Sequence, residues 1–315
     1  MATSLAYTNT IDVTDAANFI PEVWSDDVVA AYKKNLVLAA LVSAINHKGK
    51  KGDTIHLPAP VRGAATAKTA NNVVTLVTST ASEVQVLLNK HYEYSFVVED
   101  IVALQAMPSV RKFYTDDAGY ALATQVDADI RDLAATWNSG AAYSGAVIGS
   151  DGSTAYSPTA NANAGNGAAL TDAGIRQVIQ TFDDWDVPAR DRVLVIPPVE
   201  KKRLLGVSRF TEQAFTGEAG ANNSIRNGFV GDVYGVSIYV SSAIASVAAA
   251  NTTTFYRPCL FFQKDALVLA TQQDVRTQAQ YKQEALGMLV TADRVYGTKT
   301  LRAEGCRAIM VPTLG

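Results

Sequence analysis

The sequence is poor in the residues that build most metal centres and nucleophilic sites. It contains 2 cysteines and 3 histidines among 315 residues. Cys259 and Cys306 lie outside any Cys-x-x-Cys or Cys/His cluster, so neither a disulfide framework nor a zinc site is expected, and both thiols are predicted to be reduced. His47, His56 and His91 all fall in the first third of the chain, far in sequence from either cysteine.

Long apolar runs and an excess of charge are also missing. The most apolar run, Leu36 to Ile45, already contains Ser43 and is far shorter than the ~20 residues of a membrane span. The first residues lack the basic and apolar regions of a secretory signal. A net charge of −3 excludes a generic tight binder of polyanions. A length of 315 residues predicts one large or two modest domains, and an apolar share of 48% excludes wholesale disorder.

The common catalytic motifs are absent as well. The chain has no Gly-x-x-x-x-Gly-Lys-Ser/Thr loop, no Gly-x-Gly-x-x-Gly after a strand, no His-Glu-x-x-His and no Gly-x-Ser-x-Gly. The best acid–base or cation-binding candidates are Asp183, Asp184 and Asp186, beside Trp185. A solvated helix end explains these carboxylates better than a site does.

The remaining candidates also favour structural roles. A predicted long helix carries Asp127, Asp129 and Asp132, with Asp127 and Arg131 at the spacing of a favourable i,i+4 pair. For the histidines, polar or cross-strand packing is favoured over metal binding. No catalytic, cofactor-binding or metal-binding residue is therefore predicted.

The first hundred residues predict an arm, a helix and a projecting hairpin. A polar stretch over residues 1–20 is followed by a helical pattern from Ser25 to about Asn46. A basic turn follows, with Lys48, Lys50 and Lys51, which could meet phosphates or a neighbour's carboxylates but is most simply a solubilising turn. Residues 49–99 predict two long strands around a connection of ~20 residues, which fits a hairpin packed on something else better than a loop inside a domain.

The aromatic side chains of that segment share one face of a predicted strand. They are Tyr92, Tyr94 and Phe96. They could stack on nucleic-acid bases, but no lysine or arginine is interleaved with them, so core or interface packing is favoured.

The middle of the chain carries the strongest helical pattern. Apolar residues recur every three or four positions within residues 101–139, namely Leu122, Val126, Ile130, Leu133 and Trp137. A continuous helix from Ser109 to Ser139 would be ~45 Å long and would form a spine across the subunit.

The second half alternates short helices and strands. A small-residue loop over 140–169 leads to a helix capped by Thr171 that ends near Trp185. Expected next are a strand over Arg192 to Ile196, a short helix over Glu200 to Leu205 and a glycine-rich strand pair over residues 228–241. The strands predicted after residue 255 span residues 260–263, 266–271, 275–282 and 300–311, with a helical turn at Glu284 to Asp293. The fold class is α+β, without βαβ alternation or internal repeats.

An arm, a projecting hairpin and a spine helix without a chemical site indicate an assembly subunit. Apolar surface on projecting elements is stable when a partner covers it. Many identical copies can provide that cover through heterologous contacts that close into a shell.

The order of elements resembles the major capsid protein of tailed bacteriophages, the Hong Kong 97-type fold. The resemblance covers nearly the whole chain and is carried by four stretches: residues 96–100 before the spine helix, residues 187–198 as a helix-turn-strand, residues 227–241 ending in Val240-Ser241-Ser242, and residues 293–302 near the end.

The resemblance implies five parts of the subunit. These are an N-terminal arm and helix (1–48), an extended-loop hairpin (49–99), a peripheral domain with the spine helix (100–145), an axial domain (146–254, with a flexible loop over 146–169), and return strands of the peripheral domain (255–315). The arm would reach along one neighbour and the hairpin would lie over another.

The implied role is structural and non-enzymatic. Copies of the chain would form pentamers and hexamers of an icosahedral head around double-stranded DNA, assembled in the cytoplasm of the host bacterium and found in the virion. Implied partners are a separate scaffolding protein, a portal protein and, in some members, decoration proteins, with no membrane and no cofactor. The alternatives are an encapsulin-like nanocompartment shell and an enzyme of unknown class that relies on Asp183, Asp184 and Asp186.

Overall fold

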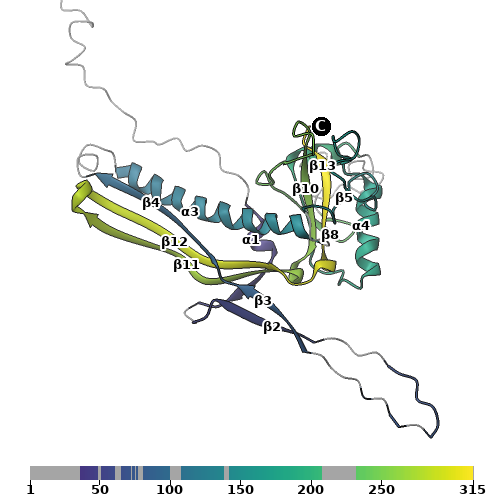
Figure 1. Ribbon diagram of the computed structural model, residues 1–315. Coiled ribbons are helices and arrows are strands. Elements are labelled where there is room, and N and C mark those ends of the chain that lie inside the picture. Colours follow the sequence, from purple (N-terminus) through teal and green to yellow (C-terminus); the bar gives the residue numbers. More distant parts are fainter. Residues whose placement is uncertain are drawn as a thin grey trace, which may run out of the picture.

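A computed structural model describes residues 36–48, 51–60, 65–71, 73–74, 76, 81–99, 108–137, 142–207 and 232–314. These residues form an elongated half built on a long helix, a compact second half, and a two-stranded ribbon that projects from their junction (Figure 1). Among them, no helix is long and apolar enough to cross a membrane. Cys259 and Cys306 are buried free thiols, as the sequence predicts.

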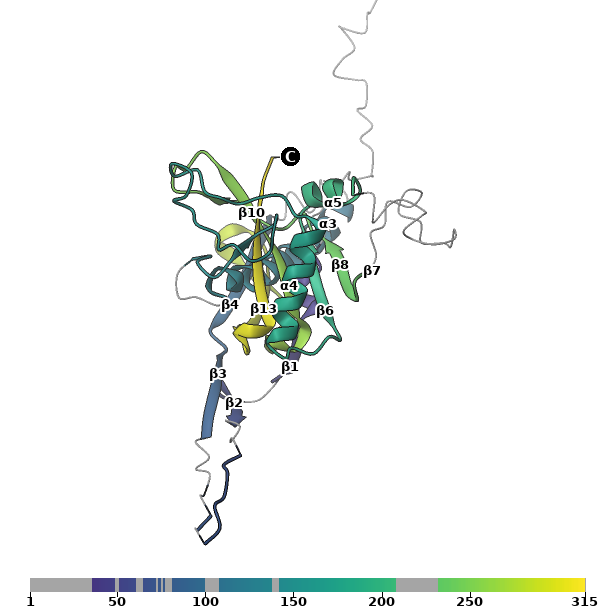
Figure 2. The same ribbon diagram turned by 90° about the vertical axis from the view of Figure 1, so that its right-hand side faces the viewer.

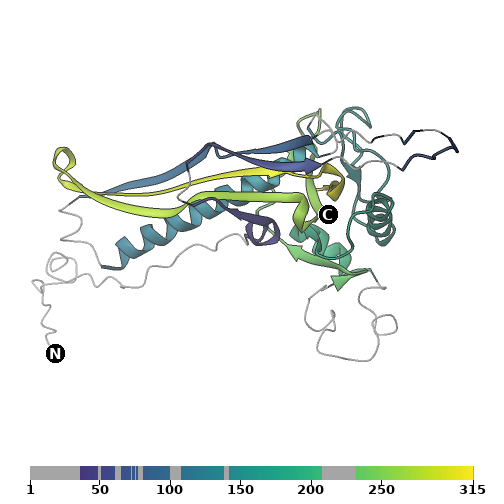
Figure 3. The ribbon, with the colours of Figure 1, turned by 90° about the horizontal axis from the view of Figure 1, so that it is seen from below.

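The elongated half is a four-stranded sheet with a helix along one face. The strand order is β1-β11-β12-β4, made of Ser43–Asn46, Leu267–Lys282, Gly287–Thr300 and Lys90–Glu99. Strand β1 runs parallel to β11, and the other pairs are antiparallel. Figure 3 shows β4, β11 and β12 side by side along most of the length of helix α3.

Helix α3, Pro108–Asp132, is the predicted spine. Its length is ~37 Å at 1.5 Å per residue, and it ends seven residues earlier than predicted, in a 3-10 turn over Leu133–Thr136. Its buried side chains recur at helical spacing and face the sheet or the junction: Ala118, Leu122, Val126 and Ile130. The apolar stripe that predicts the helix is therefore its packing face.

The compact half is a second sheet covered by two helices. Its strand order is β5-β13-β10-β6-β8-β7, with β9 on β10; the strands are Val147–Ile148, Cys306–Pro312, Phe255–Gln263, Arg192–Ile196, Val236–Val240, Asp232–Val233 and Val247–Ala248. Helix α4, Asp172–Asp184, lies across this sheet, and α5 is Pro198–Leu204 (Figure 2). As predicted, the Thr171 hydroxyl caps α4 by accepting the Gly174 N–H at 3.0 Å.

The C-terminal strands divide between the two sheets. The sequence analysis expects residues 255–315 to return together to the peripheral domain. Instead β10 and β13 form the middle of the compact sheet, whereas β11 and β12 run out into the elongated one. The reason is pairing: buried β10 has both its edges filled, by β13 and by β6.

Three predicted elements need correction. The helix expected from Ser25 to Asn46 is, within the described residues, a short turn α1 (Leu38–Leu41) followed by strand β1, because the edge of β11 supplies backbone partners for Ser43–Asn46. The helical turn expected over Glu284 to Asp293 is limited to Gln283–Ala285, and the rest is strand β12. Residues 266–282, expected as two strands, form a 3-10 turn and one irregular strand.

The projecting ribbon is shorter than the hairpin predicted over residues 49–99. Strands β2 (Thr54–Pro60) and β3 (Ala81–Leu87) pair antiparallel, whereas β4 leaves the ribbon and pairs with β12. The ribbon's base is anchored by an apolar cluster that includes Val86 of β3, Leu88 just after that strand, and Val268 and Ala270 of β11.

Candidate assembly interface

Two of the carboxylates that the sequence suggests as acid–base candidates, Asp183 and Asp186, lie at the C-terminal end of helix α4 and in the turn after it. Asp183 accepts a hydrogen bond from the buried Arg192 guanidinium at 2.7 Å. The same guanidinium also donates to the Pro188 carbonyl at 3.0 Å and lies 5.8 Å from the Phe182 ring centroid. Asp186 occupies the turn itself, at φ 55°. The described residues include no group of three or more His, Cys, Asp or Glu that could hold a metal ion.

The carboxylates of the spine helix bind three different parts of the subunit. Asp127 is 2% exposed and accepts backbone N–H groups of residues 37–39, so its predicted pairing with Arg131 is wrong. Arg131 pairs instead with the exposed Asp132 at 2.7 Å. Asp129 is buried, accepts the Tyr296 hydroxyl, and lies 3.2 Å from the Lys90 ammonium. Burial raises the pKa of Asp127, and its three backbone hydrogen bonds oppose that shift.

The histidines and the aromatic side chains make packing contacts. His56 contacts Glu83 across the ribbon at 2.9 Å, and His91 contacts Asp293 across the sheet at 3.2 Å. His47 lies after β1, and its Nε2 has no hydrogen-bond partner among the described residues. The contacts of His56 and His91 support the packing interpretation of these two residues.

The aromatic face of β4 packs on the spine helix. The Tyr94 hydroxyl donates to Asp117 at 3.3 Å, Phe96 lies 5.6 Å from the Tyr114 ring centroid, and Tyr92 lies 6.0 Å from that of Tyr296. These rings serve core packing, as predicted, and are turned away from the sheet's other face. In the basic turn, Lys48 forms an ion pair with Asp274, Lys51 is exposed, and Lys50 lies outside the described residues.

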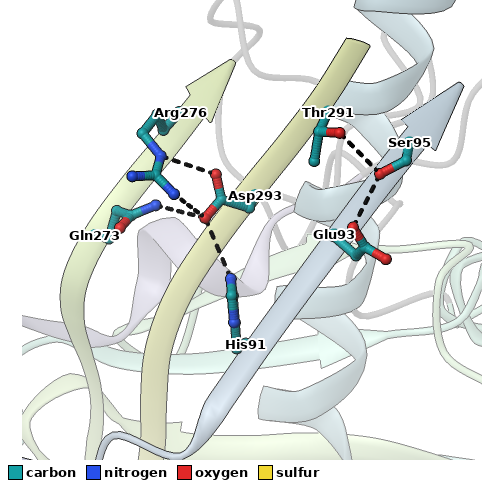
Figure 4. Close-up of polar contacts among 7 residues, drawn as sticks. All are labelled: His91, Glu93, Ser95, Gln273, Arg276, Thr291 and Asp293. Atoms are coloured by element: carbon teal, nitrogen blue, oxygen red, sulfur yellow. Dashed lines mark hydrogen bonds and ion pairs between the residues drawn. The ribbon is translucent and has the colours of Figure 1, made fainter. Parts of the chain in front are cut away.

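The face of the elongated sheet opposite α3 carries a polar cluster that the sequence analysis missed. Asp293 of β12 lies at its centre and is 6% exposed (Figure 4). It accepts two hydrogen bonds from Arg276, at 3.1 and 2.9 Å, and one from Gln273 at 2.8 Å. The hydrogen bonds of Arg276 are the main reason that the pKa of Asp293 lies below its ordinary value.

Beside this cluster, the open face carries the exposed carboxylate of Glu93 and two hydroxyl side chains. The Ser95 hydroxyl lies 2.9 Å from Glu93 and 3.2 Å from Thr291. Of the described helices, α3 is the one that runs along this sheet, on its other face (Figure 3). The arrangement fits a surface for contact with another polypeptide better than a reaction site, because the central carboxylate of Asp293 is already neutralised by Arg276.

The ribbon presents a group of highly exposed apolar side chains. Val73, Val74 and Leu76, in the connection between β2 and β3, are 90%, 61% and 84% exposed. A two-stranded hairpin is marginal in water unless a third strand or another surface supports it. Exposed apolar side chains on such an element mark a contact surface.

A sequence signal for the Asp293 cluster exists but is weak. Arg276 and Asp293 lie 17 residues apart, and they meet because β11 and β12 pair through the tight turn at Gln283–Ala285. Recognising that turn as a hairpin, instead of a helical turn, would have placed them opposite each other.

Comparison with known proteins supplies a family. The sequence model of the family described as phage capsid protein matches residues 23–311. No curated protein matches the sequence.

Solved structures from phages have the same fold. A chain of Mycobacterium phage Che8 is 23% identical, with a TM-score of 0.70, covering 93% of this chain and 97% of that one. The capsid structure of cyanophage P-SCSP1u gives 17% identity and a TM-score of 0.71, covering 99% and 98%. The capsid asymmetric unit of cyanophage Pam1 gives 13% identity and a TM-score of 0.72, covering 99% and 100%.

Proposed function

This chain belongs to the family of phage capsid proteins, and from that we propose that its copies form the pentamers and hexamers of an icosahedral head enclosing double-stranded DNA. It is a structural protein of the virion whose fold mixes helices and strands as phage capsid structures do. We assign it the Hong Kong 97-type architecture and no enzymatic activity.

The observation that carries the proposal is the projecting ribbon. It leaves the junction of the two halves, is anchored at its base, and ends in exposed apolar side chains. A monomer gains nothing by exposing such an element, whereas a neighbouring copy would bury it.

The parts of the subunit follow from this role. The extended loop is the β2–β3 ribbon, and the peripheral domain is α3 with the sheet β1-β11-β12-β4. The axial domain is the compact sheet with α4 and α5, to which β10 and β13 return. The arm, residues 1–24, lies outside the described residues and is proposed to reach along an adjacent copy.

The proposed partners follow from charge and assembly. A net charge of −3 suits an inner wall that holds packaged DNA without binding each phosphate tightly. A separate scaffolding protein, a portal protein and decoration proteins are the proposed partners during assembly in the host cytoplasm.

The test is sedimentation of the purified protein, expressed alone and with a scaffolding candidate, with electron micrographs of the fast fraction. The expected result is closed shells. A discrete ~33 kDa species in both samples would contradict the capsid role and return attention to Asp183, Asp184 and Asp186. Shells filled with cargo protein in place of DNA, when isolated from the native host, would indicate a nanocompartment.

The ribbon is tested separately. Replacing residues 61–80 by a short glycine linker should leave a folded subunit, checked by its melting transition, and abolish shells. A milder variant, Val73→Ser with Leu76→Ser, should reduce the shell fraction, whereas the control Lys68→Ser with Thr69→Ser, also exposed in the same connection, should not. Normal shells from the linker variant would contradict the assignment of the ribbon as the extended loop.

A further inference from the structure

The first described segment of the chain, residues 36–46, is a strap across the junction of the two halves. Its side chains Leu38 and Val42 are 2% and 3% exposed and belong to the largest apolar cluster. Its strand β1 pairs in parallel with β11, from Ser43 opposite Val268 to Asn46 opposite Thr271.

The first turn of the strap has no cap of its own. Helix α1 follows Val37, whose side chain has no oxygen and makes no capping hydrogen bond. The first N–H groups of a helix have no partner within the helix and must find one elsewhere. A serine or aspartate at position 37 would ordinarily supply it.

Asp127, in the last two turns of the spine helix, supplies that cap. Its Oδ2 accepts the N–H groups of Val37 at 2.9 Å and Leu38 at 3.2 Å, and its Oδ1 accepts that of Ala39 at 3.0 Å. One carboxylate thus holds three consecutive backbone groups that lie about 90 residues away in sequence.

The surroundings show that Asp127 is committed to this contact. A buried carboxylate is costly unless it is paired or hydrogen-bonded. Arg131, one helical turn further on, turns away to Asp132 and to the Ala243 carbonyl at 3.2 Å. Among the described contacts, the charge of Asp127 is therefore met by backbone N–H dipoles and not by a side-chain cation.

We propose that Asp127 is a positioning residue that clips the start of the strap to the spine helix. Releasing the clip frees the turn at residues 37–39, while β1 still holds the other end. The strap is then a hinged element with one detachable end. This inference concerns the single subunit and does not depend on whether shells form.

The test is hydrogen exchange of the full-length chain, compared in one assembly state, for Asp127→Asn and the wild type. Asparagine keeps the shape but leaves one accepting oxygen and turns an amide N–H₂ toward a backbone N–H. Losing a charged acceptor of this kind should accelerate exchange of the amides of residues 37–39 by about ten- to a hundredfold. Amides of α4 should be unchanged.

Two matched controls lie on the same helix. Asp129→Asn removes a carboxylate that is also buried, at 8% exposed, and that binds Tyr296 of β12, so it should loosen β12 and leave the strap protected. Asp132→Asn removes an exposed carboxylate and should change neither. Unchanged exchange at residues 37–39 in Asp127→Asn, or equal loss in Asp129→Asn, would overturn the proposal.

A rescue variant keeps the test decisive if Asp127→Asn does not fold. Val37→Asp in the Asp127→Asn background places a local cap at the start of α1. The proposal expects folded protein whose residues 39 and 40 regain protection. Failure of this cap to restore folding or protection would show that Asp127 acts through something other than these N–H groups.

Discussion

The buried hydroxyl of Tyr296 allows a sharp test of the packing between the spine helix and the sheet. Tyr296 is 1% exposed and donates its hydroxyl to the buried carboxylate of Asp129. Tyr296→Phe keeps the ring, with its contacts to Tyr92 at 6.0 Å and the Arg294 guanidinium at 5.6 Å, and removes the hydrogen bond.

The expected cost follows from the acceptor. Hydrogen bonds to a charged group contribute ~1.5–3 kcal/mol, and here the acceptor is left buried with Lys90 and Gln125 as its remaining partners. At ~2–4 °C per kcal/mol, the melting temperature should fall by about 3–12 °C.

The matched control is Tyr156→Phe. Tyr156 is 4% exposed, lies 5.5 Å from Tyr256 ring to ring, and has a buried hydroxyl with no hydrogen-bond partner among the described residues. Burial raises the pKa of Tyr156 to about 12. Removing this hydroxyl should leave stability unchanged or raise it by up to ~1 kcal/mol.

Urea unfolding followed by tryptophan fluorescence, with calorimetry on the same samples, measures both variants. The reasoning is refuted if Tyr296→Phe is as stable as the wild type, or if Tyr156→Phe loses as much as Tyr296→Phe. A changed urea dependence in either variant would show that cooperativity, and not the single bond, was altered.

Two further predictions use other contacts. Gly174→Ala should destabilise the compact half by several kcal/mol, because an added Cβ would lie 2.1 Å from the Gly149 carbonyl oxygen. Gly119→Ala, in α3 with open space around it, should instead stabilise the protein by ~0.5–1 kcal/mol. Thermal melting of the two variants distinguishes these outcomes. Arg276→Gln should raise the pKa of Asp293 toward its ordinary value and cost ~0.5–1 kcal/mol at neutral pH. Because the folded pKa of Asp293 is lowered, the difference between wild type and variant should be full above the ordinary carboxyl range and vanish as the pH falls through the folded pKa; a difference independent of pH would contradict the ion pair.

The sequence predicts helices α3 and α4 because the features that determine them, an apolar stripe and a capping residue, lie within or next to each helix. Helix α4 begins where Thr171 can cap it, and the apolar stripe of α3 appears as Leu122, Val126 and Ile130. The sequence also predicts strand β6, because most of its residues are β-branched or leucine. All five of them are buried in the structure.

Elements whose partners are distant were beyond local reasoning. The residues of β1 continue a helical pattern, yet they form a strand because β11 offers its edge. Asp127 and Arg131 have the spacing of a helical ion pair, but the carboxylate of Asp127 accepts hydrogen bonds from the backbone N–H groups of residues 37–39 instead. The polar cluster around Asp293 depends on a strand register that no local pattern specifies.

The order in which the strands pair has a consequence for the synthesis of the protein. Strands β1 and β4 are made early, but their partners β11 and β12 lie more than 170 residues later; His91 contacts Asp293 across 202 residues. The compact sheet likewise waits for β10 and β13. Since closing such long loops precedes any gain from pairing, the elongated sheet and the middle of the compact sheet are expected to form after nearly the whole chain has left the ribosome. A product truncated before β10 lacks the two middle strands of the elongated sheet and the strand that joins β6 to β13 in the compact one.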